Sequence, residues 1–80
     1  MMAASNPPKA WTVQDWQIFL HDEPALLRHP GSRHRVLVEQ AHALHRLQLI
    51  DRDGLSDLLE QADGALAYAV EALLDEPSVQ

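Results

Sequence analysis

Apolar residues recur at helical spacing in three stretches of the chain, and the first stretch follows Thr12. Its apolar side consists of Val13, Trp16, Phe19 and Leu20. Thr12 is a typical N-cap residue, and Asp15 three positions later completes the pattern of a capping box. Pro24 is expected either to end this helix or to begin a short helical turn, because proline is accepted in a first turn and not in a helix interior.

The second stretch follows residues 29–32 (HPGS), a combination that predicts a break in regular structure. We expect a helix over about residues 33–50, with Ser32 as its N-cap. Its predicted apolar stripe is Leu37, Ala41, Leu44 and Leu47, and its predicted solvent side is Arg35, Glu39, His42 and Arg46.

The third stretch, residues 52–75, has the clearest boundary signals. Asp51 is a suitable N-cap, Ile50 can contact Leu55 across the helix start, and Pro77 is expected to end the helix. The apolar positions are Leu55, Leu58, Leu59, Ala62, Leu66, Ala69, Val70 and Leu73. Because only a short link precedes this helix, the second and third helices are predicted to form an antiparallel hairpin.

The third helix has two apolar flanks rather than one. The alanine flank consists of Ala62, Ala65, Ala69 and Ala72, and the leucine flank of Leu55, Leu59, Leu66, Val70 and Leu73. Only a narrow polar strip remains, formed by Asp57, Glu60, Gly64, Glu71 and Asp75. Either the chain wraps this helix itself or a second copy covers one flank, and the small size of the chain favours the second copy.

These patterns predict an all-α fold: a small three-helix bundle with a C-terminal antiparallel hairpin, completed by dimerisation. The pattern leaves open whether a short helical turn follows the first helix as a further element. We expect residues 11–76 to form a single domain and residues 1–10 and 77–80 to be flexible tails.

Composition narrows the class of protein. A hydrophobic fraction of 46% over 80 residues is too high for a disordered chain, and the absence of cysteine excludes disulfides and thiolate zinc sites. The longest apolar stretch, residues 55–74, carries acidic residues that argue against a membrane span, and no secretory signal is recognisable, so we expect a cytoplasmic protein. One lysine against five arginines, in a chain rich in alanine and leucine, favours a bacterial source of high genomic GC content.

The charges are distributed unevenly along the chain, whose net charge is −6. Five arginines lie between Arg28 and Arg52, whereas seven acids and no base follow from Asp53 onward. Because the net charge is negative, we do not expect direct binding to nucleic acid. Two interpretations stay open: the two helices complement each other in charge, or the acidic helix binds a basic protein partner. Solubility alone explains the same charges.

Candidates for chemistry are few. The five histidines are His21, His29, His34, His42 and His45, and the most suggestive spacing is Glu39-x-x-His42, as in carboxylate-bridged metal bundles. Glu39 and His42 fall on the solvent side of their helix, so we expect a solvated pair, with metal binding as the distant alternative. Ser32, Ser56 and Ser78 and the isolated glycines form no nucleophile or phosphate motif, so neither an enzyme nor a cofactor is expected.

Asp63 is the most informative single residue, because it falls at the edge of an apolar stripe. A carboxylate there needs water or a partner, and Arg33, Arg35 or an arginine of another chain are the candidates. We hypothesise that Asp63 organises an interface. The candidate interface residues are Asp63, Leu59, Ala62, Leu66, Ala69, Val70, Leu73 and Trp16.

Residues 50–73, with the pair Ala62-Asp63 in the middle of a helix, resemble the last long helix of the Hha/YmoA family. The resemblance covers about a third of the chain, and the N-terminal half departs from the family's basic first helix. It implies a small transcription modulator that binds nucleoid-structuring proteins. The leading hypothesis from the sequence is a non-enzymatic protein-interaction module, a homodimer that acts as a regulator, adaptor or inhibitor of a larger partner of basic character. A transcription modulator of the Hha type is the alternative.

Overall fold

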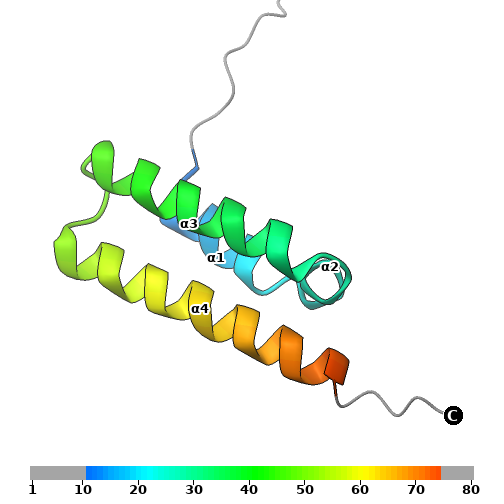
Figure 1. Cartoon of the computed structure of the whole chain (residues 1–80). Helices are drawn as coiled ribbons and strands as arrows, with labels where there is room; N and C mark the ends of the chain where they lie inside the picture. Colours follow the sequence, from blue (N-terminus) through cyan, green and yellow to red (C-terminus); the bar gives the residue numbers. More distant parts are fainter. Residues whose placement is uncertain (1–10, 75–80) are drawn as a thin grey trace, which may run out of the picture.

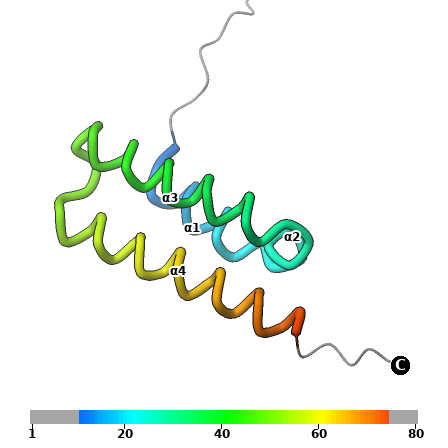
Figure 2. The backbone as a smooth tube through the Cα atoms, in the orientation of Figure 1, coloured from blue at the N-terminus to red at the C-terminus, as the bar shows by residue number. Residues whose placement is uncertain are grey.

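The computed structural model describes residues 11–74, and all its regular elements are helices: α1 (Val13–Leu20), α2 (Glu23–Arg28), α3 (Pro30–Arg46) and α4 (Arg52–Leu74). In Figure 1, α3 and α4 run antiparallel as a hairpin, and α1 lies behind α3. The backbone trace in Figure 2 places α2 at the end of the hairpin opposite the α3–α4 link. The prediction of an all-α fold is confirmed. The two predicted tails and Pro77 lie outside the described residues.

The start of α1 follows the sequence prediction. The backbone N–H of Asp15 donates to Thr12 Oγ1 at 3.1 Å, and the N–H of Thr12 donates to Asp15 Oδ2 at 3.0 Å, which is the predicted capping box. Of the two alternatives for Pro24, the short helix is the one formed, since α1 ends at Leu20 and Pro24 lies in the first turn of α2.

The boundaries predicted for the second helix were wrong at both ends. It begins at Pro30, with His29 rather than Ser32 at the N-cap position, because the fixed φ of Pro30 suits the first turn. It ends at Arg46, where Gln48 adopts a left-handed φ of 63°.

This end of α3 has the hydrogen bonds of a Schellman motif. The Gln48 N–H donates to the His45 carbonyl and the Leu49 N–H to the Leu44 carbonyl, both at 2.9 Å. Leu47, predicted for the apolar stripe, is the C-cap residue just past this helix and is 55% exposed.

The start of α4 is capped as predicted, because Asp51 Oδ1 accepts the Gly54 N–H at 2.7 Å. Ile50 and Leu55 both pack against the core beside this cap.

The core lies where α1 packs against the hairpin. Its buried side chains are Trp16, Leu20, Leu37, Ala41, Leu44, Leu58 and Ala62. Trp16 is fully buried and donates its Nε1–H to the Leu37 carbonyl at 2.8 Å, so the indole is both packed and hydrogen-bonded. At the outer edge of α1, the Trp11 and Phe19 rings lie 5.0 Å apart. Helices α1 and α2 therefore cover one side of the hairpin.

Candidate interaction surfaces of helix α4

The alanine flank of α4 faces the chain's own core. Ala62 and Ala69 are fully buried, and Ala65 and Ala72 are half-buried. Their small side chains allow other helices of the chain to approach α4 closely. Of the candidate interface residues, Ala62, Ala69 and Trp16 thus lie in the interior of the single chain, where they cannot contact a partner in this structure.

The leucine flank is covered less and less toward the C-terminal end of α4. Leu59 and Leu66 are half-buried, whereas Val70 is 42% and Leu73 46% exposed. The neighbouring Leu74 is 78% exposed. One reason is length, since α4 has 23 residues and α3 has 17, so the last turns of α4 have no α3 residue opposite them.

Asp63 lies on the surface between Leu59 and Leu66 and pairs with α3. Its Oδ1 atom is 2.8 Å from His34 Nε2, and its side chain is 74% exposed. The expected partner helix was therefore right, but the residue is His34 rather than Arg33 or Arg35.

Arg33 turns to the other side of α3. Its guanidinium carbon lies 3.5 Å from the centre of the Phe19 ring, and its Nη2 atom donates to the Phe19 carbonyl at 3.2 Å. The same Nη2 is 3.5 Å from Asp22 Oδ2. Arg33 is thus engaged with the end of α1 and does not reach α4.

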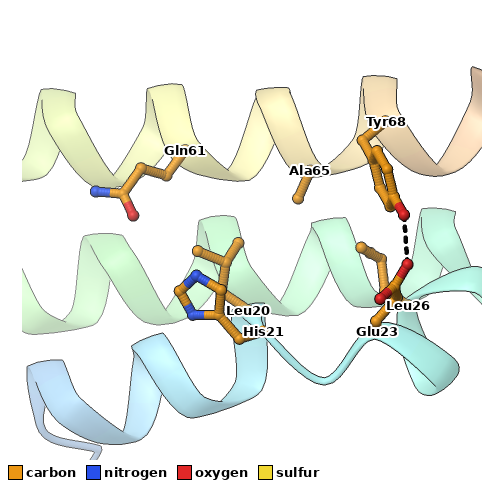
Figure 3. Close-up of a pocket in the computed structure, with 7 residues that line it drawn as sticks. All are labelled: Leu20, His21, Glu23, Leu26, Gln61, Ala65 and Tyr68. Atoms are coloured by element: carbon orange, nitrogen blue, oxygen red, sulfur yellow. Dashed lines mark hydrogen bonds between the residues drawn. The ribbon is translucent and has the colours of Figure 1, made fainter.

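A groove of about 410 Å³ lies between α4 and the corner where α1 turns into α2 (Figure 3). Its lining residues are Leu20, His21, Glu23, Leu26, Gln61, Ala65 and Tyr68. Leu20 and Leu26, both buried, and Ala65 give it an apolar floor. The sequence did not indicate this groove, because it depends on the placement of the short α2.

Two hydrogen bonds join α4 to the helices on the other side of the groove. Gln17 Nε2 donates to Gln61 Oε1 at 3.3 Å, and the Tyr68 hydroxyl donates to the Glu23 carboxylate, as Figure 3 shows. The hydrogen bond and the negative charge of Glu23 raise the pKa of Tyr68 above its ordinary value of 10.0, and desolvation adds to the effect.

The candidates for chemistry remain dispersed. Glu39 and His42 are both exposed on α3, and within residues 11–74 no group of three or more acidic or histidine side chains is arranged to hold a metal ion. Ser32 and Ser56 are exposed on their helices, and Ser78 lies outside the described residues. No helix in the described part of the chain is both long and apolar enough to cross a membrane.

Comparison of the chain with models of protein families, with curated proteins and with solved structures gives no match. The candidate functional surfaces of the described residues are therefore the leucine flank of α4 with Asp63 and the groove beside Tyr68.

Proposed function

We propose that this chain is a non-enzymatic protein-interaction module that pairs with a second copy of itself through the leucine flank of α4. In this proposal it acts in the bacterial cytoplasm as a small regulator, adaptor or inhibitor of a larger protein. The observation that carries the proposal is the exposure of three neighbouring apolar side chains, Val70, Leu73 and Leu74, at the C-terminal end of α4. Contiguous exposed apolar side chains on a small protein are typical of interaction sites.

The size of the exposed surface favours a dimer of modest affinity. Covering the exposed part of Val70, Leu73 and Leu74 contributes about 1 kcal/mol for each side chain. Two-fold symmetry uses each residue twice, which gives about 6 kcal/mol, comparable to the estimated cost of association. We therefore expect self-association that is weak and depends on the protein concentration.

Asp63 is a polar side chain in the middle of this apolar flank. It follows Leu59 by four residues and precedes Leu66 by three, so it belongs to the same surface of α4. The contact with His34 Nε2 gives the carboxylate a fixed direction. A fixed polar group within an apolar interface sets the register of two helices, which is the role we propose for Asp63.

The test is the molar mass of the chain in solution, measured by light scattering over a range of concentrations. We expect Val70→Glu to keep the chain monomeric at concentrations where the unmodified protein dimerises. Ile18→Glu is the matched control, because Ile18 is also exposed and β-branched but lies on α1. An unmodified chain that stays monomeric, or equal effects of both substitutions, would reject pairing through the leucine flank.

A transcription modulator of the Hha type is a second candidate, favoured by the acidic surface of α4. Asp57, Glu60 and Glu71 are exposed along it, and no lysine or arginine follows Arg52 in the sequence. Such a surface suits a basic DNA-binding protein rather than DNA itself. In a gel-shift assay at low salt we expect no retardation of duplex DNA by the chain alone, and retardation would replace this candidate with direct DNA binding.

A further inference from the structure

We infer that the groove between α4 and the α1–α2 corner is the docking site for an amphipathic helical segment of the larger partner, one that carries apolar side chains flanked by lysine or arginine. This inference rests on the proposed function, because it takes from it the existence of a larger protein partner. It assigns that partner to a surface separate from the leucine flank. The two surfaces lie on opposite flanks of α4, so one molecule can use both.

The shape of the groove limits what it accepts. Gln61 and Tyr68, at its two ends on the α4 side, are seven residues apart in the sequence, which corresponds to about 10 Å along a helix. Apolar side chains at positions i and i+4 of a helix are about 5–6 Å apart. The floor of Leu20, Leu26 and Ala65 therefore has room for one such pair.

The charges around the groove select the flanking residues of the partner. None of the seven lining residues is lysine or arginine, and Glu23 carries a negative charge at the rim. On α4, Asp57 lies four residues before Gln61 and Glu71 three residues after Tyr68, so each acid is beside an end of the groove on the helix surface. Both acids are exposed. A segment with basic residues around its apolar pair is complementary to this arrangement.

The hydroxyl of Tyr68 contributes to the same selection. It donates a hydrogen bond to Glu23 and so holds that carboxylate at the edge of the groove. A cation of the partner can pair with the carboxylate there without displacing the ring of Tyr68.

The test uses a fluorescent synthetic peptide of about four helical turns. Its apolar face consists of leucines at positions i and i+4, and its other residues are lysine. Binding is measured by fluorescence anisotropy at low salt. A second peptide with glutamate in place of lysine controls for charge. We expect the lysine peptide to bind and the glutamate peptide not to bind.

Two pairs of matched variants locate the peptide. Ala65→Leu fills the floor of the groove and is expected to weaken binding about tenfold, the loss typical of a central contact. Ala67→Leu places the same side chain on an exposed position of α4 and should leave binding unchanged. Glu23→Gln is expected to weaken binding a few-fold, whereas Glu39→Gln removes the same charge from the exposed side of α3 without effect.

Several outcomes would overturn the inference. They are absence of lysine-peptide binding, equal affinity of the Ala65→Leu variant and the unmodified chain, and loss of self-association in that variant, which would assign the groove to a second copy. Circular dichroism tests whether the Ala65→Leu variant is folded. If it is unfolded, the effect of Glu23→Gln, a surface change, on peptide binding tests the inference instead. Because the leucine flank is tested by molar mass without any peptide, failure of the groove and failure of the proposed dimer are distinguishable.

Discussion

Trp16 is the residue that fixes α1 against the hairpin. Its side chain is fully buried, and its Nε1–H reaches the Leu37 carbonyl on α3, so one residue supplies both packing and a directional contact. Trp11 differs because it is only half-buried, at the edge of the core. The sequence pattern placed Trp16 on the apolar side of α1 but also offered it as an interface residue, and only the packing of α1 on α3 decides between core and surface.

Replacement of Trp16 by phenylalanine tests this assignment. The change removes the hydrogen bond and leaves a void, so we expect the free energy of unfolding to fall by about 2 kcal/mol. Trp11→Phe should cost less, because the Trp11 ring is partly solvated. Urea unfolding followed by far-ultraviolet circular dichroism measures both, and equal losses would contradict the central position of Trp16.

Asp63 is expected to affect association more than folding. Because its carboxylate is mostly exposed, the contact with His34 should contribute less than about 1 kcal/mol to the free energy of unfolding of the monomer. Asp63→Ala should nevertheless weaken dimerisation, while Asp63→Asn keeps an acceptor for His34 and should weaken it less. Sedimentation equilibrium and urea unfolding measure the two effects. An Asp63→Ala variant with unchanged oligomer size and unchanged stability would eliminate the proposed role.

Tyr68 is the single tyrosine of the chain, so the phenolate absorbance reports its ionisation directly. Glu23→Gln should lower the pKa of Tyr68 toward 10.0, since the carboxylate is the main cause of the raised value. The raised pKa means that the folded chain keeps this proton at a pH where the unfolded chain releases it. The Glu23 contact therefore contributes to stability below pH 10 and is lost as the pH rises through the pKa of folded Tyr68. A titration curve unaffected by Glu23→Gln would contradict the contact.

Among the elements, the sequence predicted the helices better than their ends. The capping box at Thr12 and the cap at Asp51 could be predicted because each depends on residues three apart in the sequence. The end of α3 could not, because Gln48 adopts a left-handed conformation that usually identifies glycine or asparagine. The groove could not be predicted either, because it depends on the position of α2 relative to α4, and no local sequence pattern encodes that position.

The two glycines of α4, Gly54 and Gly64, allow a test of how this helix is packed. A Cβ at Gly64 meets no atom within 4 Å, so Gly64→Ala should raise the free energy of unfolding by about 0.5–1 kcal/mol through helix propensity. A Cβ at Gly54 would lie 3.1 Å from Ile50 Cβ and 3.3 Å from Asp51 Oδ1, so Gly54→Ala should gain less or destabilise the chain. Thermal unfolding measures both variants, and a larger gain at Gly54 would contradict the packing of the α3–α4 link against the start of α4.

As a whole, the described part of the molecule is a hairpin covered on one side. Helices α1 and α2 pack on the side of α4 that carries the alanine flank. On the leucine flank, Val70 and Leu73 are partly exposed. The two apolar flanks were visible in the sequence, but which of them the chain covers itself depends on the side on which α1 and α2 pack. We propose that two copies meet through the leucine flank, at the end where the chain leaves it partly exposed.

Amide NMR spectra recorded over a dilution series test this pairing, because they show which residues respond to association. We predict concentration-dependent shifts at Leu59, Asp63, Leu66, Val70 and Leu73, with Leu20 and Leu26 at the groove unchanged. Spectra that do not change with concentration, or shifts centred on α1 and α2, would contradict it.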